Sequence, residues 1–229
     1  MRAKGLLIAM DGTAGTGKSS VGMLAAKELG YDFLSTGEMY RALGYKTIEK
    51  KIAVDDVQKV TEIAKNIKFT FERGTDASLK MFVDGEYLGN KLHSEKVGEA
   101  ASKTSAIPSA RAVLTDKMRE IGRGGGIIME GRDIGTVVFP DAEIKFYIDA
   151  TPEERAKRRF NQLIQRGEKA DYETILECIR ARDLRDSTRT VAPLKPAEDA
   201  FIIDTSSMAL EQVVEHILSV IKEKIKNNF

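Results

Sequence analysis

The chain has 229 residues, enough for one α/β domain with insertions to bury its own core. Its 36 Lys and Arg residues balance 35 Asp and Glu, which excludes the global basic field typical of nucleic-acid-binding proteins. The first residues contain an apolar run too short for a secretory signal or a membrane span, and the single cysteine, Cys178, suits a reducing compartment. We therefore expect a cytoplasmic protein without a nucleic-acid or membrane partner, and we expect Cys178 to be buried.

Five short apolar runs predict the strands of a parallel sheet, at 6–10, 32–34, 126–129, 144–148 and 201–204. Most of them are separated by segments with helical periodicity. Strands that are apolar on both faces are typical of a parallel sheet that helices cover on both sides. The fold class expected from the sequence is therefore α/β.

The first helix is predicted from Ser19 to Leu29 and ends at Gly30, a typical helix-terminating residue. Its spacing places four apolar side chains on the face that should contact the sheet, namely Val21, Leu24, Ala25 and Leu29. A last helix, 210–225, carries apolar residues at similar spacing and is expected to close the sheet.

Two segments depart from the strand–helix alternation. From 67 to 88 the pattern changes to alternating apolar residues with the turn GTDAS between them, which predicts a small antiparallel hairpin in a side lobe. From 151 to 193, two helical stretches rich in Lys and Arg are joined near Gly167. Such a pattern fits a solvated helix face with internal ion pairs, or a set of phosphate-binding cations.

The stretch GTAGTGKS, residues 12–19, follows the first strand and opens the first helix. This spacing and context match the phosphate-binding loop, in which glycines let backbone N–H groups approach the phosphates. Lys18 would reach the β- and γ-phosphates, and the Ser19 hydroxyl would ligate Mg²⁺. The residues expected to bind ATP are Gly12, Thr13, Ala14, Gly15, Thr16, Gly17, Lys18, Ser19 and Ser20.

The rest of the chain narrows the classes that use this loop. The Asn-Lys pair in NKLH, 90–93, lacks the following Asp that guanine recognition requires, which argues against a GTPase. A motor ATPase would be expected to have Asp-Glu after an apolar strand, whereas the third strand here runs into EGRDIGTVVFP, 130–140.

Several long motifs in order make the chain resemble the bacterial cytidylate kinases, a branch of the nucleoside monophosphate kinases. They are GTAGTGKS, STGEMYRAL, ASKTSAIPSAR, EGRDIGTVVFPDA, TPEERAKRR and RDLRDSTRTVAPL. The resemblance implies phosphoryl transfer from ATP to CMP or dCMP with Mg²⁺, by a protein that we expect to be monomeric.

The resemblance also implies the architecture. It predicts a core of five parallel strands in the order 2-3-1-4-5, formed by residues 1–35, 106–150 and 191–229. Residues 36–105 would form the lobe that binds the nucleoside monophosphate, with the hairpin as an insert, and 151–190 a helical lid. In the lid we expect unpaired like charges until phosphates are bound.

Phosphoryl transfer brings two anionic groups together, so arginine is well suited to the site because its planar cation meets two phosphate oxygens. The expected catalytic residues are Lys18 of the loop and, as the resemblance implies, Arg132, Arg189 and, in the lid over ATP, Arg155 and Arg159. By resemblance, the acceptor nucleotide would contact Thr36, Tyr40, Arg41, Ser102, Arg111, Arg132, Asp133, Arg182, Asp186 and Arg189.

Three of these residues are expected at the cytosine edge. Asp133 would accept from the amino group, Arg111 would donate to the ring acceptors, and Ser102 could do either. Alternatively, Asp133 and Arg111 pair with each other and only support the site. Tyr40 fits a nucleotide contact or a core aromatic equally well.

The chain also departs from the family pattern. It has Ser35-Thr36-Gly37 where Asp-Ser-Gly is common, so a hydroxyl is retained at Thr36. It has Glu130 in place of the Asp before Gly-Arg-Asp, and the longer side chain argues against a water-mediated metal role there. Asp11 could contact the hydration shell of Mg²⁺ or cap a turn.

Two other interpretations remain from the sequence. One is a related small-molecule kinase that acts on AMP, UMP or shikimate, against which the hairpin insert and residues 101–111 argue. The other is a binding module in which ATP closes a lid without catalysis, against which Lys18, Ser19 and the arginines argue.

Overall fold

In the computed structural model, which describes residues 2–228, five parallel strands form a sheet in the order β2-β6-β1-β7-β8. Counted along the chain, this is the predicted order 2-3-1-4-5. Ile8 in the central strand pairs with Ile128 on one side and Ile144 on the other. The strands are Leu7–Asp11 (β1), Asp32–Ser35 (β2), Ile127–Glu130 (β6), Ile144–Asp149 (β7) and Phe201–Asp204 (β8).

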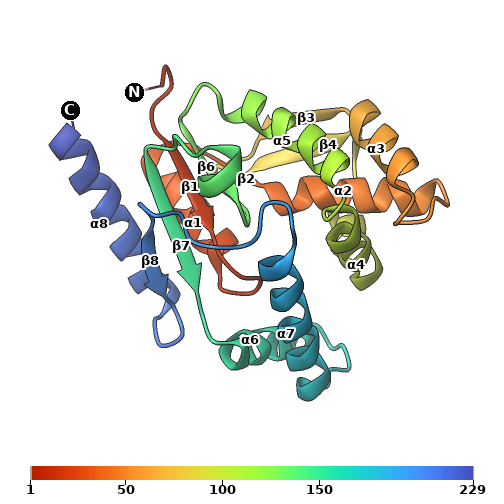
Figure 1. The fold of residues 1–229 in the computed structure, drawn as a ribbon. Helices are drawn as coiled ribbons and strands as arrows, with labels where there is room; N and C mark the ends of the chain where they lie inside the picture. Colours follow the sequence, from red (N-terminus) through yellow and green to blue (C-terminus); the bar gives the residue numbers. More distant parts are fainter. Residues whose placement is uncertain (1, 229) are drawn as a thin grey trace.

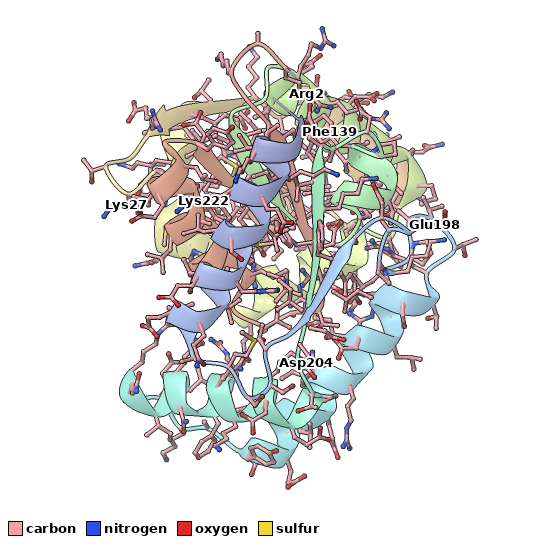
Figure 2. The ribbon with its side chains drawn as sticks, turned by 90° about the vertical axis from the view of Figure 1, so that its left-hand side faces the viewer. Arg2, Lys27, Phe139, Glu198, Asp204 and Lys222 are labelled. Carbon is pink, nitrogen blue, oxygen red and sulfur yellow. The ribbon has the colours of Figure 1, made fainter. Side chains whose placement is uncertain are left out.

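Helices cover both faces of the sheet, as the apolar strands predict (Figure 1). Ile8 and Met10 of β1 pack in a cluster with apolar residues of α1 (Lys18–Leu29) and α8 (Leu210–Asn228). Figure 2 faces this side, where α8 lies across the view beside the edge strand β8. On the opposite face, Leu7 and Ala9 pack with residues of α2 (Thr36–Glu49) and α5 (Pro108–Gly122).

Helix α1 begins at Lys18, one residue earlier than predicted, and ends at Leu29 before Gly30. Val21 and Ala25 are buried, but Leu24 is 39% exposed, so its predicted place against the sheet is wrong. Gly22 takes that place: a Cβ there would lie 2.6 Å from the Phe33 ring. The helix therefore packs closer to the sheet than a leucine would allow.

The predicted hairpin is present and extends to a small antiparallel sheet of three strands. Its strands are Phe69–Arg73 (β3), Leu79–Val83 (β4) and Glu86–Tyr87 (β5), and it follows the helix Val57–Asn66 (α3). The turn between β3 and β4 contacts the core: the Phe33 N–H donates to the Ala77 carbonyl at 2.9 Å, and Arg73 pairs with Asp32.

The last element before α5 is α4 (Glu95–Thr104), which follows a 3₁₀ turn at Gly89–His93 and packs on α2. The contact is close because α2 has glycine at position 44, where a Cβ would lie 2.7 Å from the Ala101 nitrogen. This packing fixes the position of the Ser102 side of α4 relative to α2.

Two helices that pack on each other, α6 (Pro152–Gln165) and α7 (Tyr172–Thr188), project below the sheet in Figure 1. They correspond to the predicted lid helices. Cys178 on α7 is exposed, so the expectation that it is buried is wrong. Within residues 2–228, no helix is both long and apolar enough to cross a bilayer.

Candidate phosphoryl-transfer site

The loop between β1 and α1 curves so that its backbone N–H groups point toward a common centre. Gly12 has φ 142°, and a Cβ there would lie 1.9 Å from the Ile148 carbonyl oxygen, so only glycine allows β1 and β7 to approach here. Gly17 then caps α1, and the N-terminus of the helix begins at Lys18. This geometry aims free N–H groups and the positive end of the helix dipole at one point.

Lys18 is 3% exposed, and its side chain folds back on the loop. It donates to the Thr13 carbonyl and to the Thr16 hydroxyl, the latter at 3.2 Å. Burial, followed by the neighbouring charge of Arg132, lowers its pKa from 10.5 to about 7. An anion beside Lys18 would stabilise the protonated form of its side chain and raise its pKa again. A bound phosphate would therefore offset the electrostatic cost of burying this cation.

Ser19 and Glu130 provide oxygen atoms beside the loop. The Ser19 hydroxyl donates to a Glu130 carboxylate oxygen at 2.7 Å, and Glu130 is 8% exposed at the end of β6. Hard oxygen donors from a hydroxyl and a carboxylate fit Mg²⁺, which keeps several waters and uses few protein ligands. The longer Glu130 side chain thus reaches the residue predicted to bind the metal.

Both carboxylate oxygens of Asp11 are hydrogen-bonded to the backbone. Its two oxygens accept from the backbone nitrogens of Ile134 and Gly135 at 2.8 and 2.7 Å, which caps the π-helix Ile134–Val138. Burial is the main cause that raises its pKa to about 6. Of the two roles that the sequence left open for Asp11, capping is the one that the structure displays.

All the predicted acceptor-side residues line one pocket between α2, α4, the segment after β6, and α7. They are Thr36, Tyr40, Arg41, Ser102, Arg111, Arg132, Asp133, Arg182, Asp186 and Arg189. Thr36 is buried, and its hydroxyl donates to the Glu130 carbonyl at 2.8 Å, which keeps the end of β6 beside α2. Residues from widely separated motifs therefore meet at the carboxyl end of the sheet.

Several buried polar atoms of this pocket have no hydrogen-bond partner within residues 2–228. They are Tyr40 Oη, Arg111 Nε, Asp133 Oδ2, Arg182 Nε and Arg189 Nη2. Unsatisfied buried polar atoms are costly and uncommon, and five in one pocket indicate a place where a polar ligand supplies the partners.

Arg111 and Asp133 form a buried pair, with Arg111 Nη2 2.6 Å from Asp133 Oδ1 and both side chains 4% exposed. The Arg111 guanidinium also lies 5.1 Å from the centre of the Tyr40 ring. Burial acts to lower the Arg111 pKa, but the neighbouring Tyr40 and Asp133, the latter also through its hydrogen bond, raise it above its usual value. The pair leaves the second oxygen of Asp133 available.

The other arginines of the pocket are only partly neutralised. Arg132 Nε is 3.2 Å from Asp186, and Arg41 donates to the Leu92 carbonyl at 2.9 Å. Burial and the neighbouring Arg132 lower the Arg182 pKa to about 10. Arg189 donates to the Ala192 carbonyl and lies 3.9 Å from Asp133. The result is a concentration of positive charge that suits a phosphate.

The lid arginines differ from one another. Arg155 is 2% exposed, forms a two-pronged pair with Asp183, and donates to the Ala14 carbonyl of the phosphate-binding loop at 3.2 Å. Arg159 is half-buried, and its charge lowers the Arg41 pKa after the larger effect of burial. Arg180 pairs with Glu153. The expectation of unpaired lid charges is therefore wrong for Arg155 and Arg180, because acidic residues on the same two helices meet them.

A larger cavity, of about 570 Å³, lies between α2, α3 and the turn after β4, away from the phosphate-binding loop. Two of its lysines have acidic partners of their own, Lys46 with Glu49 and Lys59 with Asp56. The unsatisfied arginines and the phosphate-binding loop, rather than cavity size, identify the site.

The parallel sheet has helices on both faces and a phosphate-binding loop after its first strand, which is the fold of a P-loop kinase. The chain belongs to the cytidylate kinase family: the family model described as Cytidylate kinase matches residues 8–223.

Curated relatives extend the match along almost the whole chain. A cytidylate kinase of Geobacillus sp. (strain WCH70) is 44% identical over 218 residues, which is 95% of this chain and 97% of the relative. A cytidylate kinase of Thermosipho melanesiensis is 43% identical over 219 residues, covering 96% and 98%. A solved structure of an uncharacterized protein from Eubacterium ventriosum ATCC 27560 shares the fold, with a TM-score of 0.51 at 13% identity over 96% of this chain and 99% of that one.

Proposed function

We propose that this protein transfers the γ-phosphoryl group of ATP to CMP or dCMP and forms ADP and the nucleoside diphosphate. The observation that carries the proposal is the set of buried, unsatisfied arginine and aspartate atoms in one pocket, together with Glu130, which lines that pocket and contacts Ser19 of the phosphate-binding loop. Family membership and the relatives' names support the choice of CMP as the acceptor.

The phosphate-binding loop would hold the phosphates of ATP. Its N–H groups and the start of α1 would bind the β-phosphate, and Lys18 would exchange its contacts with Thr13 and Thr16 for phosphate oxygens. Ser19 and Glu130 would hold Mg²⁺. When bound, the metal supplies positive charge that neutralises the phosphates during transfer.

The acceptor pocket would hold the monophosphate in line with the γ-phosphate. An oxygen of the acceptor phosphate forms the new bond to phosphorus, and the bond to the β–γ bridging oxygen breaks so that ADP leaves. Arg41, Arg132 and Arg189 would screen the acceptor phosphate, with Arg182 and Asp186 near its sugar and phosphate. No protein nucleophile is required, because positioning and cations provide the catalysis.

The lid would close over ATP from the other side. Arg155 is already held against the Ala14 carbonyl by Asp183, and Arg159 lies on the same helix one turn later. Closure would bring Arg159 to the phosphates and exclude water that competes with the acceptor.

Initial rates of ADP formation with CMP, dCMP, UMP and AMP, each with ATP and Mg²⁺, test this proposal. We expect turnover with CMP and dCMP, at least about 10²-fold lower kcat/KM with UMP, and no acceptor-dependent rate with AMP. Lys18→Ala serves as the control for a contaminating kinase. Equal rates with AMP and CMP would indicate a different monophosphate kinase, and no acceptor-dependent rate would indicate a binding module.

A further inference from the structure

One face of α7 supplies four residues toward the acceptor pocket. Arg182, Arg185, Asp186 and Arg189 are spaced at i, i+3, i+4 and i+7, which places them on one side of a helix and of the turn that ends it. Three of the four line the pocket and were predicted from the sequence. Arg185 is the member of this face that has no role in the account above.

Arg185 contacts the other side of the pocket. Its Nη1 donates to the Ser102 hydroxyl at 2.7 Å, which connects the lid helix α7 to α4 in the acceptor lobe across 83 residues of sequence. The Arg185 charge also helps lower the pKa of Glu99 on α4, after the larger effect of Lys103. Two observations therefore place the Arg185 guanidinium against α4.

The chemistry of the two groups sets the direction of the contact. A guanidinium only donates hydrogen bonds, so the Ser102 oxygen must accept. A hydroxyl that accepts one bond still has its own proton and a second lone pair. Arg185 can therefore hold Ser102 in one rotamer without occupying the groups that Ser102 would offer to a base.

We propose that Arg185 is a positioning residue for the acceptor base: it holds the Ser102 hydroxyl at the base end of the pocket and thereby joins the lid to the acceptor lobe. The proposal rests on the proposed function, because it takes Ser102 to contact the base. An arginine whose only role was to keep α7 soluble would not need a hydrogen bond to a neutral side chain on another lobe. Arg180 on the same helix is an example of an arginine with a local role, since it pairs with Glu153 inside the lid.

Steady-state kinetics of Arg185→Ala with CMP test the proposal, with Arg180→Ala as the matched control on the same helix. We expect Arg185→Ala to raise KM for CMP about 3- to 10-fold, the effect of one partly exposed charged hydrogen bond. KM for ATP and the thermal midpoint should stay at wild-type values, and Arg180→Ala should match wild type throughout. Arg185→Lys, which can still donate, should recover part of the loss.

A double-mutant cycle with Ser102→Ala identifies the path of the effect. If Arg185 acts through Ser102, Arg185→Ala adds no further loss once the hydroxyl is absent. The proposal would be overturned if the KM increases of Arg185→Ala and Ser102→Ala multiplied in the double variant. A lowered KM for CMP in Arg185→Ala, or equal KM values in Arg185→Ala and Arg180→Ala, would also overturn it. Those results leave the proposed function intact as long as wild type phosphorylates CMP, whereas a wild type without CMP-dependent turnover overturns both.

Discussion

Asp133→Asn tests how the pocket would distinguish cytosine from uracil. Asp133 is 3% exposed; its Oδ1 is held by Arg111 at 2.6 Å, and its Oδ2 is buried without a hydrogen-bond partner in the described chain. An ionised carboxylate only accepts, so Oδ2 suits the amino group of cytosine and opposes the carbonyl that uracil has there. Asp133 can therefore pair with Arg111 through one oxygen and hydrogen-bond to the base through the other.

The magnitude follows from the burial of both partners. Uracil would face Asp133 with an acceptor and Arg111 with its N3–H donor, and each buried mismatch costs about 1–3 kcal/mol. Two mismatches disfavour UMP by about 10²-fold or more in kcat/KM. An asparagine can keep an oxygen toward Arg111 and turn its amide N–H groups toward uracil, which should narrow the CMP-to-UMP ratio by at least about tenfold.

Initial rates of ADP formation with CMP and UMP measure this ratio. Asp199→Asn is a suitable control, because it removes the charge of an exposed carboxylate that pairs with Lys145 outside the pocket, and it should leave the ratio unchanged. Equal losses for CMP and UMP in Asp133→Asn would show that Asp133 supports Arg111 without reading the base.

Four further predictions concern the loop, the lid and the lobe packing. Lys18→Ala should lower kcat by at least about 10²–10³ with an unchanged melting temperature, and retention of most of kcat would contradict its assignment. In the free protein the Lys18 ammonium loses its proton as pH rises through about 7, so kcat/KM for ATP should fall above that pH; a flat profile to pH 9 would refute this. Hydrogen exchange in 151–190 should slow when ATP and CMP analogues bind together, and unchanged protection would exclude lid closure. Gly44→Ala should lower the free energy of unfolding by about 1–3 kcal/mol in thermal or urea unfolding, because its Cβ would meet the Ala101 backbone. We expect this loss despite the higher helix propensity of alanine. An equal or higher stability would contradict the close packing of α2 on α4.

The sequence predicted those features whose signal is local. The sheet, the hairpin and the phosphate-binding loop each follow from a run of neighbouring residues. Helix faces were harder: on α1, glycine at 22 rather than Leu24 meets the sheet. On α7, Leu176 is buried, and Cys178 two residues later lies about 200° around the helix and is exposed.

Most side-chain contacts between distant segments of the chain could not be predicted from the sequence. The contact of Ser19 with Glu130 joins the first turn of α1 to the end of β6. Because α1 follows β1 and β6 lies next to β1, the strand order together with a carboxylate at the end of β6 could have indicated it. The π-helix that Asp11 caps and the Asp183 partner of Arg155 depend on packing between distant segments. The contact of Arg185 with Ser102 is of the same kind, although the helical spacing of Arg185 with Arg182 and Arg189 was visible.

Transfer of a phosphoryl group to a cytidine monophosphate is tested most directly by following the γ-phosphate of ATP. With ATP labelled at the γ-position, CMP and Mg²⁺, we expect the label to appear on the β-phosphate of CDP in a 1:1 ratio with ADP. Label released as inorganic phosphate, or retained on ATP while CMP binds, would contradict it.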